Sequence, residues 1–81
     1  MTKKELAEKI RESLLRFFRL KNERKEVQVI EDKESQVYIS ISPYSMKEEI
    51  GYTKRDEEGR LIFVPGKHLL SDWMRWMRRR R

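Results

Sequence analysis

The sequence predicts an α+β fold, a two-layer sandwich in which a helix, three or four antiparallel strands and a second helix follow one another. Near both ends of the chain, apolar residues recur at spacings of three and four, which is the period of an amphipathic helix. Between these ends, apolar and polar residues alternate with the period of two that is typical of half-buried strands. We therefore expect the order α-β-β-β(-β)-α in one small domain, residues 1–81.

The first helix is predicted from Thr2 to about Lys21. Thr2 and Glu5 have the spacing of a capping box, in which each side chain bonds to the backbone of the other residue. The residues of the apolar stripe are Leu6, Ala7, Ile10, Leu14, Phe17 and Phe18. Because an antiparallel sheet can leave one of its faces in water, we expect both helices to lie on the same face of the sheet.

Two strands are predicted at 27–30 and 37–41, joined by the polar run EDKES into an antiparallel hairpin. Pro43 ends the second strand, since proline has no backbone N–H to give to a ladder. The segment 45–50 is ambiguous. Ser45 and Glu48 could cap one helical turn, whereas Ile50 and Tyr52 suit a strand, and we favour a bend followed by a strand.

A second hairpin is predicted from strands at 49–54 and 60–64, with Gly59 in the connecting loop because glycine readily adopts a left-handed conformation. Residues 61–64 are apolar without alternation, which favours a central strand that is covered on both faces. Pro65 and Gly66 end this strand. The helical period returns from about Lys67.

Composition excludes several classes of site. The chain has no cysteine and one histidine, so it cannot form a disulfide, a thiolate metal site or a cluster of imidazoles, and we predict neither metal nor cofactor. Charged residues make up 42% and apolar residues 37%, which is typical of a surface with many ion pairs, of a designed chain, or of a subunit that completes its core as a homodimer. No stretch resembles a signal peptide or a membrane span, so we expect a cytoplasmic protein without a membrane partner.

Positive charge is concentrated at the C-terminal end. Residues 67–81 hold six Lys and Arg against the single acid Asp72, and they hold both tryptophans. The preceding residues carry fourteen Lys and Arg against thirteen acids. A local cationic region favours a polyanion, because neutralised phosphates release their condensed counterions.

We therefore predict a small, non-enzymatic module that binds DNA or RNA phosphates through its basic C-terminal helix and through a tail at 78–81. The residues predicted to contact nucleic acid are Lys67, Arg75, Arg78, Arg79, Arg80 and Arg81. Arginine suits this function because its planar guanidinium matches phosphate geometry. An alternative interpretation is structural, since basic residues in the last turn of a helix complement its macrodipole.

A protein–protein interaction module is the alternative function, either a homodimer or a small inhibitor, of phage or mobile-element type, of a nucleic-acid-handling protein. Its predicted interface consists of Trp73, Met74, Trp76 and Met77. The same apolar residues at helical spacing also suit packing on the sheet, and we favour that for both tryptophans.

A toxin-like ribonuclease is a third hypothesis, which depends on His68, a residue type that serves as a general base. No second group lies at a recognisable spacing from it, so we predict no catalytic residue. The order of elements resembles the double-stranded-RNA-binding fold and the small HicA-type toxins. The double-stranded-RNA-binding fold has a lysine cluster at the start of its second helix, where this chain has Lys67 alone. The HicA-type toxins have a histidine on a middle strand, where this chain has Tyr38 and Tyr52. We assign the chain to neither family.

Overall fold

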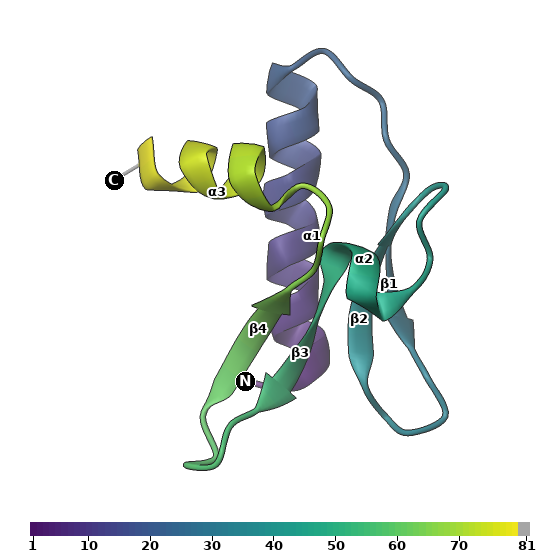
Figure 1. Ribbon diagram of the computed structural model, residues 1–81, viewed down its shortest axis with the longest axis vertical. Helices are drawn as coiled ribbons and strands as arrows, with labels where there is room; N and C mark the ends of the chain where they lie inside the picture. Colours follow the sequence, from purple (N-terminus) through teal and green to yellow (C-terminus); the bar gives the residue numbers. More distant parts are fainter. Residues whose placement is uncertain (80–81) are drawn as a thin grey trace.

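The computed structural model describes residues 1–79, which form a long helix, four strands, a short helix between the second and third strands, and a final helix (Figure 1). The elements are α1 (Lys3–Leu20), β1 (Val27–Glu31), β2 (Val37–Ile41), α2 (Lys47–Ile50), β3 (Gly51–Arg55), β4 (Leu61–Pro65) and α3 (Leu70–Arg79). The predicted α+β class and its element order are confirmed, with four strands rather than three.

The four strands form one antiparallel sheet in the order β1-β2-β3-β4. The prediction that residues 61–64 form a central strand is wrong, because β4 lies at an edge of the sheet. Each strand pairs with the next one along the chain, so the last strand has a single neighbour. Its apolar side chains are half-buried. Phe63 lies on the inner face and contacts α3, while Val64 pairs with Tyr52 on the other face.

Helix α1 covers the inner face of the sheet and supplies about half of the core. Its capping box is present: the Glu5 amide donates to Thr2 Oγ1 at 3.1 Å, and the Thr2 amide donates to Glu5 Oε1 at 3.0 Å. The hydrogen bonds from Thr2 lower the pKa of Glu5. The buried apolar residues are Ala7, Ile10, Leu14, Phe17, Phe18, Val27, Val37, Ile39, Ile41, Ile50 and Trp73. The predicted stripe of α1 is therefore the face that packs.

The segment at 45–50 differs from the bend and strand that the sequence favoured. Residues 47–50 form the helical turn α2, and β3 begins at Gly51. Neither Ser45 nor another side chain caps this turn, since the residue before it, Met46, makes no capping hydrogen bond. The turn is held instead by Ile50, which is 4% exposed in the core, a tertiary contact that local sequence does not reveal.

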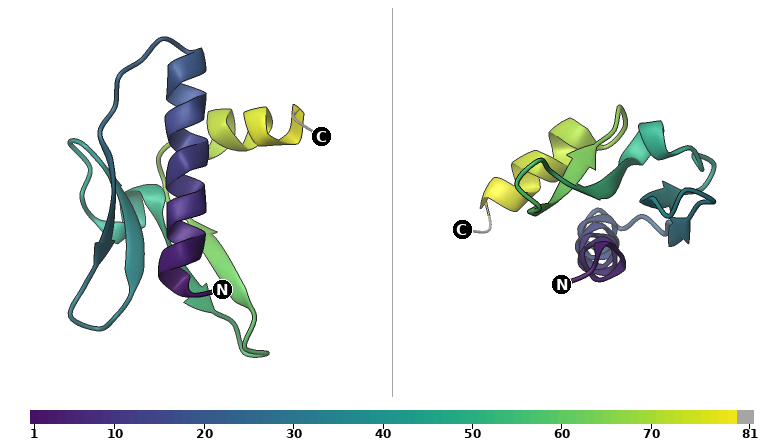
Figure 2. Two further views of the ribbon diagram at one scale, coloured as in Figure 1. Left: turned by 180° about the vertical axis from the view of Figure 1, so that it is seen from behind. Right: turned by 90° about the horizontal axis from the view of Figure 1, so that it is seen from below.

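Helix α3 contacts Phe63 on the inner face of the sheet, the face that α1 covers, in agreement with the prediction that both helices lie on one face, but it does not run alongside α1. It crosses α1 near the C-terminal half of α1 and extends away from the sheet (Figures 1 and 2). Trp73 fixes this position: its indole Nε1 donates to Ser13 Oγ of α1 at 3.2 Å, and its ring meets Phe63 of β4 edge-on, with ring centroids 5.9 Å apart. Because α1 already covers the core residues of the sheet, α3 packs at the β4 side and against α1.

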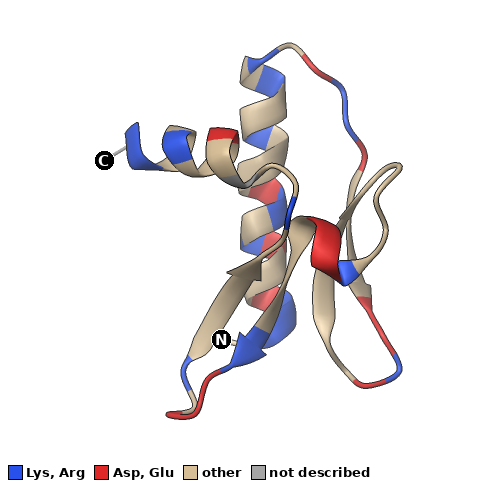
Figure 3. Ribbon diagram, viewed as in Figure 1, with Lys and Arg blue, Asp and Glu red and all other residues tan. Residues whose placement is uncertain are grey.

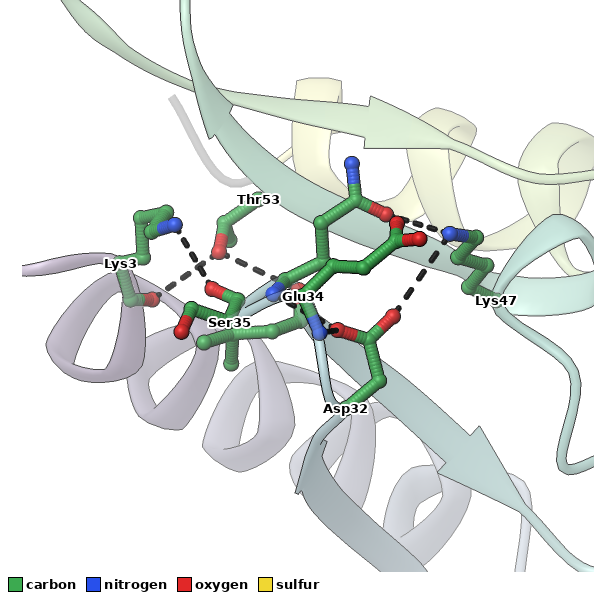
Figure 4. A network of polar contacts seen from close by, with 8 residues as sticks. Lys3, Asp32, Glu34, Ser35, Lys47 and Thr53 are labelled. Atoms are coloured by element: carbon green, nitrogen blue, oxygen red, sulfur yellow. Dashed lines mark hydrogen bonds and ion pairs between the residues drawn. The ribbon is translucent and has the colours of Figure 1, made fainter.

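A network of polar contacts holds the N-terminal end of α1 against the first hairpin and β3 (Figure 4). Buried Thr53 donates from its hydroxyl to Lys3 O at 3.2 Å and to Val37 O at 3.3 Å, and Lys3 Nζ donates to Ser35 O at 2.7 Å. In the hairpin, Asp32 Oδ1 accepts the amides of Glu34 and Gln36, each at 2.9 Å. Bonds of this kind satisfy backbone groups that strand pairing leaves unused.

We expect Trp73→Ala to lower the free energy of unfolding by about 3–5 kcal/mol, because it opens a large cavity at the contact between α1, β4 and α3. Trp73→Phe should cost less, since it keeps a ring against Phe63. Met46→Ala is the control, because Met46 is 62% exposed. Urea denaturation followed by circular dichroism measures all three. A loss below about 1 kcal/mol in Trp73→Ala would contradict this account of how α3 is held.

We expect Asp32→Asn to weaken the dependence of stability on pH in acid. The amide of Gln36 has the largest effect and lowers the pKa of Asp32; burial opposes it, and the amide of Glu34 and the ammonium of Lys47 lower the pKa further. Between this lowered pKa and the ordinary unfolded value, the unfolded chain binds more protons, so the stability that Asp32 contributes is lost as pH falls. Denaturation at a series of acid pH values, with Glu34→Gln as the control, should show a shallower decline for Asp32→Asn alone.

Candidate nucleic-acid interface

Three of the predicted arginines lie on α3. Arg75, Arg78 and Arg79 are exposed, and Figure 3 shows that the basic end of α3 projects away from α1. Within residues 1–79, none of these three guanidinium groups forms an ion pair, whereas Arg11 and Arg60 pair with nearby carboxylates. Their positive charge is therefore available to an anion from outside the chain.

A shallow groove of about 320 Å³ runs between α1 and α3. Aromatic rings form part of it: Phe17 of α1 and Trp76 of α3 contact each other in a tilted arrangement, with ring centroids 5.6 Å apart. Lys21 Nζ lies 5.1 Å from the centroid of the Phe17 ring, within the range of a cation–π contact. The residues lining the groove are Phe17, Lys21, Asp72, Arg75, Trp76 and Arg79.

The charge of the groove is positive, since three basic residues line it with one acid. Asp72 Oδ2 lies 3.8 Å from Lys21 Nζ, and the two side chains are 63% and 44% exposed. A pair this exposed and this long contributes little to stability, because water screens it. Asp72 therefore reduces the positive potential of the groove without removing it.

The adjoining face of α3 is also cationic. Ser71, Met74, Arg75 and Arg78 line a shallow depression of about 490 Å³, and Arg75 borders both this depression and the groove. The helical period explains the arrangement, because residues three and four apart lie on one face. One short helix thus carries its arginines on two adjacent faces.

Of the other predicted contact residues, Lys67 does not line the groove. Lys67 is exposed in the segment between β4 and α3, where its amide donates to Glu48 O at 3.1 Å. Arg78 and Arg79, which the sequence placed in a tail, belong to α3. Arg80 and Arg81 lie outside the described residues.

The four residues of the alternative protein interface differ in exposure. Trp73 is 6% exposed, and Met74 and Trp76 are half-buried against the core. Met77 is 39% exposed, and its sulfur accepts a hydrogen bond from Ser13 Oγ at 3.1 Å. The preference for packing rather than exposure is confirmed for Trp73 and, in part, for Trp76.

Sequence reasoning missed a pair around His68. The imidazole Nε2 lies 2.6 Å from Glu49 Oε2, and the ring stacks on Tyr44 with centroids 4.1 Å apart. Local spacing could not reveal Glu49, because the contact joins α2 to the segment before α3. Phe17 and Lys21 were missed as groove residues for the same reason, since no local signal shows that α3 crosses α1 there.

The described residues contain no group of three or more acidic or histidine side chains placed to hold a metal ion. Across residues 1–79, no helix is both long enough and apolar enough to cross a membrane. Comparison with known proteins finds no matching family, no similar curated protein and no similar solved structure.

Proposed function

We propose that the protein binds nucleic acid through contacts from α3 and the C-terminal end of α1 to the phosphate backbone. The observation that supports this is the set of exposed guanidinium groups on α3, which have no acidic partner within residues 1–79. The positive charge that the sequence concentrates near its C-terminal end thus lies, for Arg75, Arg78 and Arg79, on the exposed surface of α3.

The contact chemistry follows from the side chains. Each guanidinium can donate two parallel hydrogen bonds to phosphate oxygens, and each neutralised phosphate releases counterions. Phe17 and Trp76 line the same groove, and Trp76, which is the more exposed of the two, offers an aromatic surface on which the edge of a base or sugar can pack. Phosphate contacts carry little sequence information, so binding should depend weakly on base sequence.

The protein–protein alternative has less support. Trp73, one of its two predicted tryptophan anchors, is buried and would be available only if α3 separated from α1. Interface hot spots of this kind are large side chains that reach into a partner. This alternative and the cytoplasmic location stay predictions.

We expect the triple variant Arg75→Gln, Arg78→Gln and Arg79→Gln to lose most of its affinity for nucleic acid. The slope of log K against log salt concentration should become shallower by about 2–3, because each lost phosphate contact removes about 0.7–0.9 from the slope. Fluorescence anisotropy with labelled single-stranded and duplex probes across a salt series measures this effect.

The matched control is the triple variant Lys4→Gln, Lys33→Gln and Lys54→Gln, which removes the same charge from exposed positions outside the groove. It should keep nearly the same salt slope as the unaltered chain. If both triple variants lost affinity equally, net charge alone would account for binding and the α3 surface would have no special role.

We expect Asp72→Asn to raise the affinity about two- to fivefold, because it frees Lys21 and removes the one acid among the described residues that line the groove. Glu57→Gln makes the same change of charge in the exposed turn between β3 and β4, and it should have a smaller effect. The same anisotropy titration compares the two variants at one salt concentration. An equal gain in both would contradict the assignment of binding to the groove.

A further inference from the structure

A second cavity, of about 240 Å³, lies beside the groove and shares Lys21 with it. We propose that this cavity is a ribonuclease site in which His68 is the general base that activates the 2′-hydroxyl of RNA. This inference rests on the proposed function, because the α3 surface would supply most of the binding of the RNA strand. The residues that carry the proposal are Lys21, Lys25, Tyr44, Glu49, His68 and Leu69.

Three contacts hold the imidazole of His68 in one orientation. Its Nε2 lies 2.6 Å from Glu49 Oε2, its ring stacks on Tyr44, and its backbone amide donates to Glu49 O at 2.7 Å. With Nε2 engaged by a carboxylate, Nδ1 is the nitrogen that can accept a proton, and within residues 1–79 it has no partner. A carboxylate that orients a histidine in this way also stabilises the imidazolium that forms during proton transfer.

The position of His68 suits contact with a substrate. Its side chain is 42% exposed and lines the cavity, so a ligand can reach it. The next residue, Leu69, has a φ of +66°, a left-handed conformation that costs energy for a residue other than glycine. Packing of Leu69 against the core maintains this conformation, which places His68 at the cavity and turns the chain into α3.

Basic residues provide the charge that phosphoryl transfer needs. Lys21 and Lys25 line the cavity together with one acid, Glu23. Ammonium groups beside a reacting phosphate stabilise the negative charge that develops on its oxygens. Because Lys21 lines both the groove and the cavity, an RNA strand held by Arg75 and Arg79 can reach the cavity by passing Lys21.

The reaction is an internal transesterification. Nδ1 of His68 takes the proton of the 2′-hydroxyl, the 2′ oxygen forms a bond to the adjacent phosphorus, and the bond from phosphorus to the 5′ oxygen breaks. The 5′ oxygen takes a proton from water, and the resulting hydroxide is neutralised by the proton that His68 releases. The products are a 2′,3′-cyclic phosphate and a 5′-hydroxyl end. RNA supplies its own nucleophile, so the step requires neither a metal ion nor a covalent enzyme intermediate.

The test uses the full chain and two single-stranded oligonucleotides of the same mixed sequence, one of RNA and one with 2′-O-methyl groups. The methylated strand measures binding, because it has no free 2′-hydroxyl to react. We expect the unaltered protein to bind both strands and to cleave only the RNA, with cyclic phosphate ends. His68→Ala and His68→Gln should each reduce the cleavage rate by about 100-fold or more while binding of the methylated strand stays within about twofold.

Glu49 is a positioning residue in this proposal, so its test separates kcat from KM. We expect Glu49→Gln to lower kcat by about tenfold or more and to leave KM within about twofold, since the RNA is held elsewhere. Glu48→Gln is the matched control, because Glu48 is the exposed neighbouring acid on α2. It should leave both parameters unchanged.

Either of two results would overturn the ribonuclease proposal: RNA that stays intact with the unaltered protein in excess, or cleavage by folded His68→Gln at the unaltered rate. If the methylated strand is bound in a salt-dependent manner but the RNA stays intact, the proposed binding function holds and only the catalytic inference fails. If neither strand is bound, the binding function itself fails. Circular dichroism of each variant distinguishes loss of the fold from loss of the site.

Discussion

The burial of Trp73 between α1 and β4 determines where the candidate functional residues lie. Its indole contacts Ser13 on one side and Phe63 on the other, and through these contacts α3 is held across α1. The groove exists because of this crossing, since it is lined by Phe17 and Lys21 from α1 and by Trp76 and two arginines from α3. A large aromatic side chain suits this task because it buries much area and its N–H still finds an acceptor.

The distribution of charge over the fold explains why one surface stands out in a chain that is 42% charged. Over most of the surface, basic and acidic residues are interspersed, and several pair directly, such as Arg60 with Asp56 and Lys47 with Asp32. Such exposed pairs add little stability, but they lower the local potential. The arginines of α3 have no such partners within the described residues, so the field of this surface is not cancelled locally.

The predictions that held depended on local signals. The period of α1, its capping box, both hairpins and the left-handed Gly59 follow from neighbouring residues, because helix caps and tight turns are decided by nearby backbone geometry. The predictions that failed depended on distant contacts. An apolar run at 61–64 cannot distinguish a central strand from an edge strand that packs against a helix, and the turn at 47–50 depends on the burial of Ile50.

The sequence by itself determined the element order, the apolar face of α1 and the concentration of arginine near the C-terminal end, because these follow from residue identity and spacing. Only the tertiary structure decided that β4 is an edge strand and that α3 crosses α1. It also decided that Lys21 lines the groove with Arg75 and Arg79, and that Glu49 contacts His68. The physical reason is that a crossing of helices is set by how a few large side chains pack. Trp76 and Phe17 make the contact between α3 and α1, and Trp73 and Phe63 join α3 to β4, across elements that no local period connects.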